Sequence, residues 1–294
     1  MKKDDRPQVY KSNALIEAHF AASLMEQRIL LACMAQVRRD GQITDEVMYR
    51  VSVEDVTPAT HHSKDIYRQL AQAAHRLKHR DVWIAEYPNG AGTRPELLST
   101  GWVQTIRYKK DQGCIELRFN KDILPYLSQL NSEFTGYCID DIEGMTSQYA
   151  IRFYELLCQW QTKGQLELSV GWLRQALALD NKYPTYKDFR KRVIEPAIAQ
   201  INTHTPVTVS YIPIKTGRSV THLSLDFKIA ATHKPTARTS AKASRPPNAT
   251  STPRSAPQAG KPMYGISPLM IERHKADGDS WEDAALKALY AKKR

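Results

Sequence analysis

The stretch YPTYKDFRKRVIEPAIAQIN (183–202), followed by THTPVTVSYIPIKTGRSVTHLSLDF (203–227), decides the fold of this chain. Its first part has apolar residues at helical spacing together with several cations. Its second part has two strand-like runs joined by a Lys-Thr-Gly-Arg turn (215–218). A helix that leads into a hairpin, with cations on both, is what a winged-helix module needs to read a DNA groove and grip its backbone. We therefore expect this stretch to bind DNA.

The helix of this stretch carries its cations outside its apolar arc, with one exception. Lys187, Lys191 and Arg192 lie outside the arc, whereas Arg190 falls on the apolar side by spacing alone. We expect Arg190 to emerge at the start of the helix, where a recognition helix is least covered. Pro196 removes a backbone hydrogen bond and is expected to kink or weaken the helix. The arc itself consists of Phe189, Val193, Ile194, Ala197 and Ile201.

The first turns of a recognition helix are the part that reaches base edges. Arginine has the best fork for guanine, while lysine and threonine serve bases or phosphates. A basic helix face is about as often merely solvated, and it is the following hairpin that favours DNA here. We expect phosphate contacts from Arg192 and from the hairpin tip, at Lys215 and Arg218. The base-reading candidates are Thr185, Lys187, Arg190 and Lys191.

The N-terminal part predicts another αβ module. Apolar residues recur three to five apart over 13–37, which predicts one long helix. A short strand, a helix from about Ser63 to His79 and three strand-like runs follow, so both modules place helices first and a hairpin last. The cations of the second helix are as consistent with DNA contact as with simple exposure to solvent. These candidates for a secondary DNA contact are Lys64, Arg68, Arg76 and Lys78.

Composition divides the chain into four segments. Residues 1–130 and 131–229 carry the two modules. Residues 230–262 are rich in Ala, Thr, Ser and Pro and carry Lys and Arg but no acidic residue, which predicts a disordered basic linker. Residues 263–294 contain an amphipathic stretch, 280–290, whose SWED opening predicts a short capped helix.

The net charge of +11 over 294 residues favours a polyanionic partner, without separating nucleic acid from an acidic membrane surface. No apolar run approaches the roughly 18 residues of a membrane span, and the first residues lack a signal-peptide core. We therefore expect a cytoplasmic protein without a membrane partner. Cys33, Cys114, Cys138 and Cys158 form no CxxC pair, which predicts buried free thiols.

Signatures of catalysis are missing from the sequence. It contains no GxxxxGK[ST] loop, no GxSxG elbow and no HExxH helix. His61 and His62 stand near Asp55 and Asp65 but without a third ligand at helical spacing, so we expect no metal and no cofactor. A DNA-nicking enzyme would carry two histidines that flank one apolar residue, together with a tyrosine nucleophile. We expect no catalytic residues and a protein that is not an enzyme.

Several motifs together resemble the initiator replication proteins of iteron-containing bacterial plasmids, the RepA/RepE type. The resemblance covers about residues 11–229, and Gln200 departs from it where the family usually has an acidic residue. The motifs that carry it are SNALIEAHFAASLMEQRILLACMAQV (12–37), SQYAIRFYELLCQW (147–160), WLRQALAL (172–179) with Tyr183, YKDFRKRVIEPAIAQIN (186–202) and VTVSYIPIKTGRSVTHLSLDF (207–227).

The resemblance implies an α+β fold of two tandem winged-helix domains, which the linker and the short C-terminal helix would follow. The second domain would make the main contact with the direct repeats (iterons) of the plasmid origin. The first would serve dimerisation and an auxiliary DNA contact. Monomers of such proteins bind the repeats, whereas dimers bind an inverted repeat and repress the protein's own gene. Host initiator protein, host replicative helicase and chaperones are the further partners implied.

Carried onto this chain, the resemblance assigns base reading to the four candidates above and phosphate contacts to Arg192, Lys215 and Arg218. Thr185 departs from the basic residue that some members have at its position. Two alternatives stay open. One is a winged-helix transcriptional repressor without a role in replication, and the other is a DNA-nicking replication enzyme.

Overall fold

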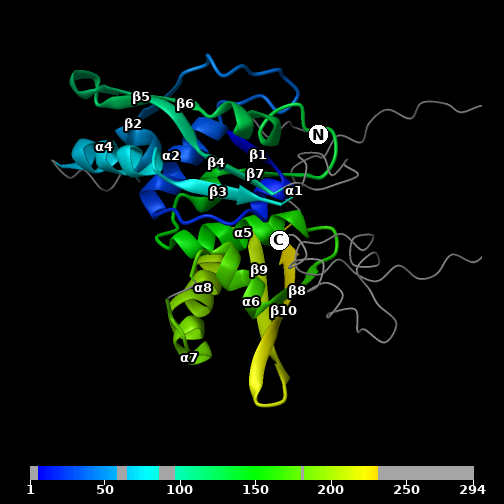
Figure 1. Ribbon diagram of the computed structural model, residues 1–294. Helices are drawn as coiled ribbons and strands as arrows, with labels where there is room; N and C mark the ends of the chain where they lie inside the picture. Colours follow the sequence, from blue (N-terminus) through cyan, green and yellow to red (C-terminus); the bar gives the residue numbers. More distant parts are fainter. Residues whose placement is uncertain (1–5, 58–64, 86–96, 180–181, 231–294) are drawn as a thin grey trace, which may run out of the picture. The chain divides into compact units, whose positions relative to one another are not determined.

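The computed structural model describes residues 6–57, 65–85, 97–179 and 182–230 (Figure 1). All of the described residues belong to one compact unit. The linker expected at 230–262 lies outside the described residues apart from its first residue, and the helix expected within 263–294 lies wholly outside them.

One order of elements occurs twice in the chain: a helix, a strand, two more helical elements and a hairpin. In the first copy these are α2 (Leu24–Met34), β2 (Tyr49–Ser52), α3 (Val53–Val56), α4 (Ile66–Leu77), β5 (Val103–Lys109) and β6 (Cys114–Phe119). In the second copy they are α5 (Gln148–Gln159), β8 (Gln165–Ser169), α6 (Val170–Ala176), the segments α7 (Tyr186–Phe189), η4 (Arg190–Ile194) and α8 (Glu195–His204), and the hairpin β9 (Val207–Thr216) and β10 (Ser219–Ile229).

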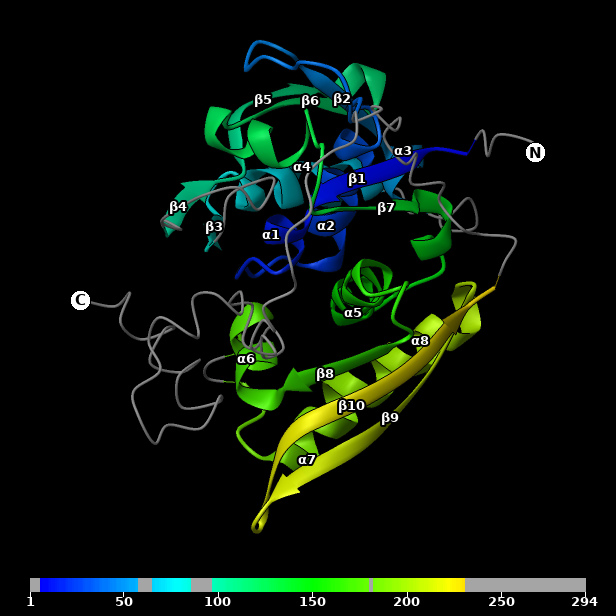
Figure 2. The same ribbon diagram turned by 90° about the vertical axis from the view of Figure 1, so that its right-hand side faces the viewer.

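The two copies also share their strand order. The sheets run β2-β6-β5 and β8-β10-β9, all antiparallel, so that in each copy the first strand pairs with the last. Each copy is therefore a winged helix, and the expected tandem repeat is confirmed. We refer to them as the first winged helix (α2 to β6) and the second winged helix (α5 to β10). In the second, the long β9–β10 hairpin runs beside α7 and α8 (Figure 2).

The other elements extend the first winged helix. Strand β1 (Gln8–Ser12) pairs with β7 (Phe134–Cys138), and β3 (Asp81–Ile84) pairs with β4 (Leu98–Gly101). The remaining elements of the described residues are short helical turns: α1 (Asn13–Ile16), η1 (Lys110–Gln112), η2 (Lys121–Tyr126) and η3 (Ile139–Ile142). Because β1 is N-terminal and β7 comes from beyond residue 130, this pair joins parts of the chain that are far apart in sequence. The division at residue 130 stays a prediction.

The single helix predicted over 13–37 was wrong, because the structure has two helices with a break between Ile16 and Leu24. Ser23 starts the second helix with a capping box: its hydroxyl accepts from the backbone N–H of Glu26, whose carboxylate accepts from the N–H of Ser23. Within the break, His19 exchanges backbone hydrogen bonds with Trp83. The apolar spacing continues through the break, which is why periodicity alone did not reveal it.

The core follows the apolar spacing inside each helix. On α4 the residues Leu70, Ala73, Ala74 and Leu77 are fully buried, whereas Ile66 at its start is half-buried. Burial of one such leucine contributes roughly 1.5–3 kcal/mol, so the face as a whole fixes the helix on the sheet. All four cysteines are buried and free, which confirms the prediction of free thiols. None of the described helices is both long and apolar enough to cross a membrane.

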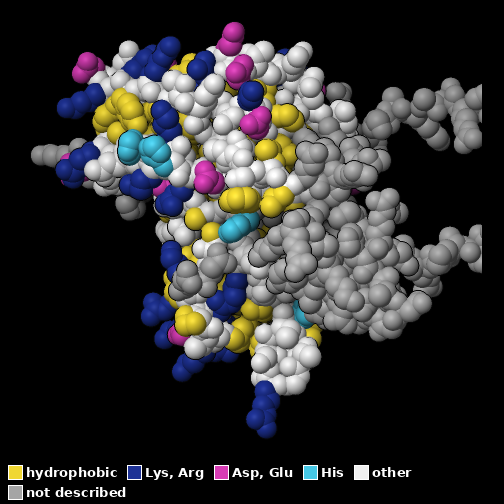
Figure 3. Space-filling view, in the orientation of Figure 1, with side chains coloured by type: hydrophobic (Ala, Val, Ile, Leu, Met, Phe, Trp, Pro, Cys, Tyr) yellow, Lys and Arg dark blue, Asp and Glu magenta, His cyan; other side chains and the backbone are white. Residues whose placement is uncertain are grey.

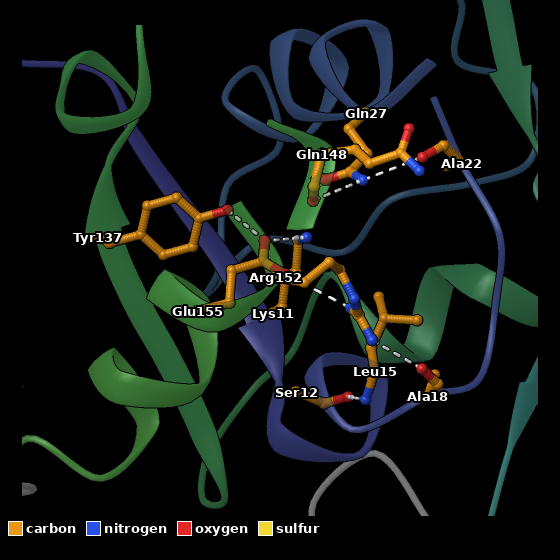
Figure 4. A network of polar contacts seen from close by, with 10 residues as sticks. All are labelled: Lys11, Ser12, Leu15, Ala18, Ala22, Gln27, Tyr137, Gln148, Arg152 and Glu155. Carbon is orange, nitrogen blue, oxygen red and sulfur yellow. Dashed lines mark hydrogen bonds and ion pairs between the residues drawn. The ribbon is translucent and has the colours of Figure 1, made fainter. Parts of the chain in front are cut away.

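A network of buried charges joins β1 and β7 to α5 (Figure 4). Lys11 Nζ and the Tyr137 hydroxyl both donate to Glu155 Oε1, and Arg152 lies 3.5 Å from the other carboxylate oxygen. Arg152 also donates to the carbonyl of Ala18 at 2.7 Å. Burial acts to raise the pKa of Glu155, but Lys11 and Arg152 outweigh it and hold that pKa below its ordinary value. The carboxylate therefore stays ionised inside the protein, paired on both oxygens.

Gln200 occupies the position where an acidic residue was the usual family choice. Its side-chain oxygen accepts from the backbone N–H groups of Thr146 and Ser147 at 2.9 Å each, and its amide donates to the Thr146 hydroxyl at 3.0 Å. An amide both accepts and donates here, which a carboxylate could not do. Gln200 therefore attaches α8 to the segment that leads into α5.

Candidate nucleic-acid interface

Thr185 caps the basic helix of the second winged helix. Its hydroxyl accepts from the backbone N–H of Asp188 at 3.1 Å and donates to the Asp188 carboxylate at 2.7 Å. A hydroxyl has only one hydrogen, and this one is given to Asp188. The structure therefore gives Thr185 a capping role at the start of α7, and its base-reading role stays a prediction.

Arg174 on α6 holds the loop that leads into this helix, and sequence reasoning assigned it no role. Its guanidinium donates to the carbonyls of Lys182 and Tyr183 at 3.1 and 2.5 Å, and it lies 4.5 Å from the centre of the Phe189 ring. Burial lowers the pKa of Arg174. Tyr183 has a left-handed backbone (φ 54°), which costs a non-glycine residue about 1–2 kcal/mol. The bond to the Tyr183 carbonyl stabilises this turn, and its only sequence signal was the motif WLRQALAL.

Between α7 and α8 the helix widens into one π-helical turn, Arg190–Ile194, closed by a bond from the Glu195 N–H to the Arg190 carbonyl. Pro196 comes directly after Glu195. Proline has no N–H, and its ring clashes with the carbonyl four residues earlier in a regular α-helix. A wider turn relieves this clash. The disturbance predicted at Pro196 thus takes the form of a π-turn.

Three of the helix cations are exposed and form no ion pair among the described residues: Lys187, Lys191 and Arg192. Arg190 is 49 % exposed, and its Nε lies 3.3 Å from Glu195 Oε1. The predicted apolar arc is confirmed, since all five of its members are fully buried. Figure 3 shows Lys and Arg side chains along the outer side of this helix and at the tip of the neighbouring hairpin. The helix is thus anchored by one face and presents cations on the other.

The β9–β10 hairpin is the wing, and its tip carries exposed Lys215 and Arg218 on either side of a tight turn. Gly217 in the turn has a left-handed backbone (φ 62°), the conformation that favours glycine. Asn202 at the end of the helix donates to the carbonyl of Val209 at 2.9 Å and accepts from its N–H at 2.7 Å. This pair of bonds fastens helix to wing, so that both groups of cations belong to one rigid unit. Sequence reasoning missed this role of Asn202.

Two of the candidate cations on α4 of the first winged helix form ion pairs within the part of the chain that the structure describes. Arg76 lies 2.9 Å from the fully buried carboxylate of Glu26, which Arg80 also contacts at 3.3 Å. Arg68 pairs with Asp65 at 3.0 Å on the surface. Arg76 therefore serves as a counter-ion to a buried acid. Of the other two candidates, Lys78 is exposed at the end of α4 and Lys64 lies outside the described residues.

The wing of the first winged helix, β5–β6, was missed as a candidate. It carries Arg107, Lys109 and Lys110, of which Lys109 pairs with Glu116. Tyr108 stands among them and is 48 % exposed. These residues occupy the positions in the first winged helix that the cationic tip occupies in the second. The run RYKK (107–110) was the signal in the sequence.

Within the described residues no group of three or more His, Cys, Asp or Glu side chains is placed to hold a metal ion. The described surface offers chemistry of another kind. Two winged helices each present a helix and a wing with cations, and such groups donate charged hydrogen bonds to phosphates and to base edges.

Comparison with known proteins places these features in a family. The model described as "Initiator Replication protein, WH1" matches residues 8–158, and the model described as "Initiator Rep protein, WH2" matches residues 169–227. Two of the relatives from Escherichia coli carry a functional name. The PI protein is 22% identical over 236 residues, which covers 70% of this chain and 77% of the relative. A replication initiation protein is 25% identical over 209 residues, which covers 67% and 62%.

Among solved structures, the crystal structure of the Pi initiator protein in complex with iteron DNA shares the fold. The TM-score is 0.61 at 20% identity, and the match covers 78% of this chain and 100% of that one.

Proposed function

Since the chain belongs to the initiator replication protein family, we propose that it binds direct repeats at the origin of its own plasmid and initiates replication there. The observation that carries this proposal is the second winged helix, in which Asn202 fastens a helix with exposed Lys187, Lys191 and Arg192 to a wing with a cationic tip. The fold is also that of a protein whose structure was solved with iteron DNA.

The two winged helices would make different contacts with DNA. Helix α7–α8 would enter the major groove with the turns that carry Lys187 and Lys191, while Arg192 and the wing tip would grip the flanking phosphates. In the described part of the first winged helix, Arg68 and Arg76 on α4 form ion pairs, whereas the wing carries exposed cations. It would make the auxiliary contact, so that one monomer covers one repeat.

Further steps of the proposal rest on family membership. The bound monomers would open an AT-rich stretch with host initiator protein and recruit the host replicative helicase. Dimers would bind an inverted repeat and repress the protein's own gene, and chaperones would convert dimers into monomers. We place this activity in the cytoplasm.

We propose that the protein does this without catalysing a reaction. The alternative of a DNA-nicking enzyme predicts a covalent protein–DNA adduct that one Tyr→Phe substitution abolishes. Incubation with supercoiled plasmid, followed by denaturing electrophoresis, is expected to show intact DNA and free protein. A covalent adduct would contradict this part of the proposal.

An origin-transformation assay separates an initiator from a repressor. A plasmid that carries the origin, but not the gene for this protein, is introduced into cells that supply the protein from a second plasmid. We expect colonies with the wild-type protein and none with K191A/R192A, whose fold should be intact because both side chains are exposed. A wild-type protein that silences its promoter in a reporter assay but never supports colonies would establish a repressor instead.

A further inference from the structure

We infer that the π-helical turn Arg190–Ile194 determines which side chains of the recognition helix face DNA, and that Pro196 is a positioning residue that holds this turn. The inference rests on the proposed function, because it concerns how the same helix reads sequence. It assigns a role in specificity to a residue that itself need not touch DNA.

The first observation is the phase of the apolar stripe. Phe189, Val193, Ala197 and Ile201 stand four residues apart, and each is fully buried. A regular α-helix has 3.6 residues per turn, so each four-residue step overshoots by about 40°, and three steps by about 120°. One wider turn takes up part of this overshoot. The turn therefore lets Phe189 keep its place in the core together with the residues of α8.

The second observation concerns Arg190. Arg190 and Ala197 are seven residues apart, and in a regular α-helix such residues lie only about 20° from each other. Ala197 is fully buried, so a regular helix would aim Arg190 at the core. In the structure the Arg190 side chain is instead 49 % exposed. The π-turn thus brings out a cation that helical spacing alone would bury.

The third observation is the ion pair between Arg190 and Glu195. These residues are five apart, whereas side chains on an α-helix meet when they are three or four apart. The same five-residue separation joins the Glu195 N–H to the Arg190 carbonyl. The ion pair is therefore specific to the π-turn, and it leaves Lys191 and Arg192 as the unpaired cations of this turn among the described residues.

Pro196 makes the regular alternative costly. Its ring would clash with the carbonyl of Arg192, and it offers no N–H to the α-helical ladder. Alanine at this position would remove the clash and supply the missing N–H. The regular helix would then compete with the π-turn. Any shift to the regular form moves Arg190 toward the core or Phe189 out of it, and either change rotates the residues that face DNA.

The test uses the full chain and its P196A variant. The wild-type chain first selects its preferred duplex from a random library. Both proteins are then titrated with that duplex and with a scrambled duplex of the same composition. We expect P196A to lower the ratio of specific to non-specific affinity by roughly tenfold, the order of one base contact. Binding to the scrambled duplex should not change, because the cations remain. P125A, an exposed proline in η2, is the matched control and should keep the wild-type ratio.

A double-mutant cycle separates positioning from a merely structural role. If Pro196 acts by placing Lys191, then P196A should cost little further specificity in a K191A background, whereas it should add fully to R218A on the wing. Thermal unfolding checks the fold, and P196A should still unfold cooperatively above the temperature of the titrations, since the substitution also removes a helix breaker.

The inference is overturned if P196A keeps the wild-type specificity ratio, if it weakens specific and scrambled duplexes alike, or if its effect adds fully to that of K191A. A wild-type chain that selects no sequence at all would instead contradict the proposed function. The two failures are therefore distinguishable.

Discussion

Helical spacing predicted the burial of some side chains correctly and of others wrongly. The arc from Phe189 to Ile201 was predicted correctly because burial follows periodicity. Arg190 was placed on the apolar side because a wheel at 100° per residue has no means of showing a π-turn. The cap at Thr185 could have been found, since Thr-x-x-Asp before an apolar run resembles a capping box. A residue's partner is harder to predict, and Arg76 is the example, because nothing near it in sequence reveals Glu26.

We predict that replacing Arg190 and Lys191 by alanine weakens binding to the selected repeat more than binding to random DNA. Removal of each base-reading side chain should cost roughly 1–3 kcal/mol of discrimination. Fluorescence anisotropy with both duplexes measures it. K163A, another exposed lysine of the second winged helix outside the recognition helix and the wing, is the control and should change neither affinity. An equal loss on both duplexes would make the two residues phosphate contacts.

We predict that T185A lowers stability, because the Asp188 N–H loses its cap. Loss of an N-cap costs about 1 kcal/mol, and T185S should restore it. Thermal unfolding followed by circular dichroism measures the difference. If T185A keeps the wild-type Tm but loses specific affinity, then Thr185 reads a base after all.

The order of helices and strands in each winged helix could be predicted from the sequence. Each helix has an apolar periodicity of its own, and each hairpin has alternating strands and a recognisable turn. The wing is the clearest case, with two alternating runs and a Lys-Thr-Gly-Arg turn (215–218) between them. Contacts between elements could not be predicted from these local signals. The bonds from Asn202 to Val209 and from Arg174 to Tyr183 join segments whose approach is fixed only by the folded chain. The break between α1 and α2 was hidden for the same reason, since the partner of its extended segment is Trp83.

We predict that K215A with R218A flattens the salt dependence of DNA binding. Each phosphate that is no longer neutralised should reduce the slope of log K against log salt by about 0.9. Titrations at several salt concentrations measure this slope. K228A, an exposed lysine at the far end of β10, is the matched control and should keep the wild-type slope. An unchanged slope in the double variant would remove the wing from the DNA interface.

Across the whole molecule, α5 is the element that connects parts distant in sequence. It packs against α8 and β7, and it supplies Arg152 and Glu155 to the buried charge network with Lys11 of β1. This network could not be predicted from the sequence alone, because a charged residue among apolar residues looks like a break in the apolar face of a helix. The tandem order was visible as a whole, since both halves repeat helices first and hairpin last.

We predict that E155Q destabilises the fold, because Lys11 and Arg152 keep their charges but lose their carboxylate. Breaking a buried pair in this way costs about 3–5 kcal/mol. The pKa of Glu155 is held below its ordinary value, so its stabilisation is complete above about pH 4.3 and is lost as the pH falls through the lower pKa of the folded state.

The difference in Tm between wild type and E155Q should therefore be full at neutral pH and shrink in acid. E167Q, which changes an exposed carboxylate on β8, is the control and should follow wild type at every pH. A difference that stays constant down to strong acid would mean that the charge of Glu155 is not what stabilises α5 against β1.

The most direct measurement of the proposed function is a hydroxyl-radical footprint of the full chain on fragments of its own replicon at moderate salt. We predict protection of several evenly spaced direct repeats, with the K215A/R218A variant losing protection at the edges of each repeat first. Absence of any selective protection would contradict sequence-specific binding, and protection of a single inverted repeat beside a promoter would contradict the initiator role.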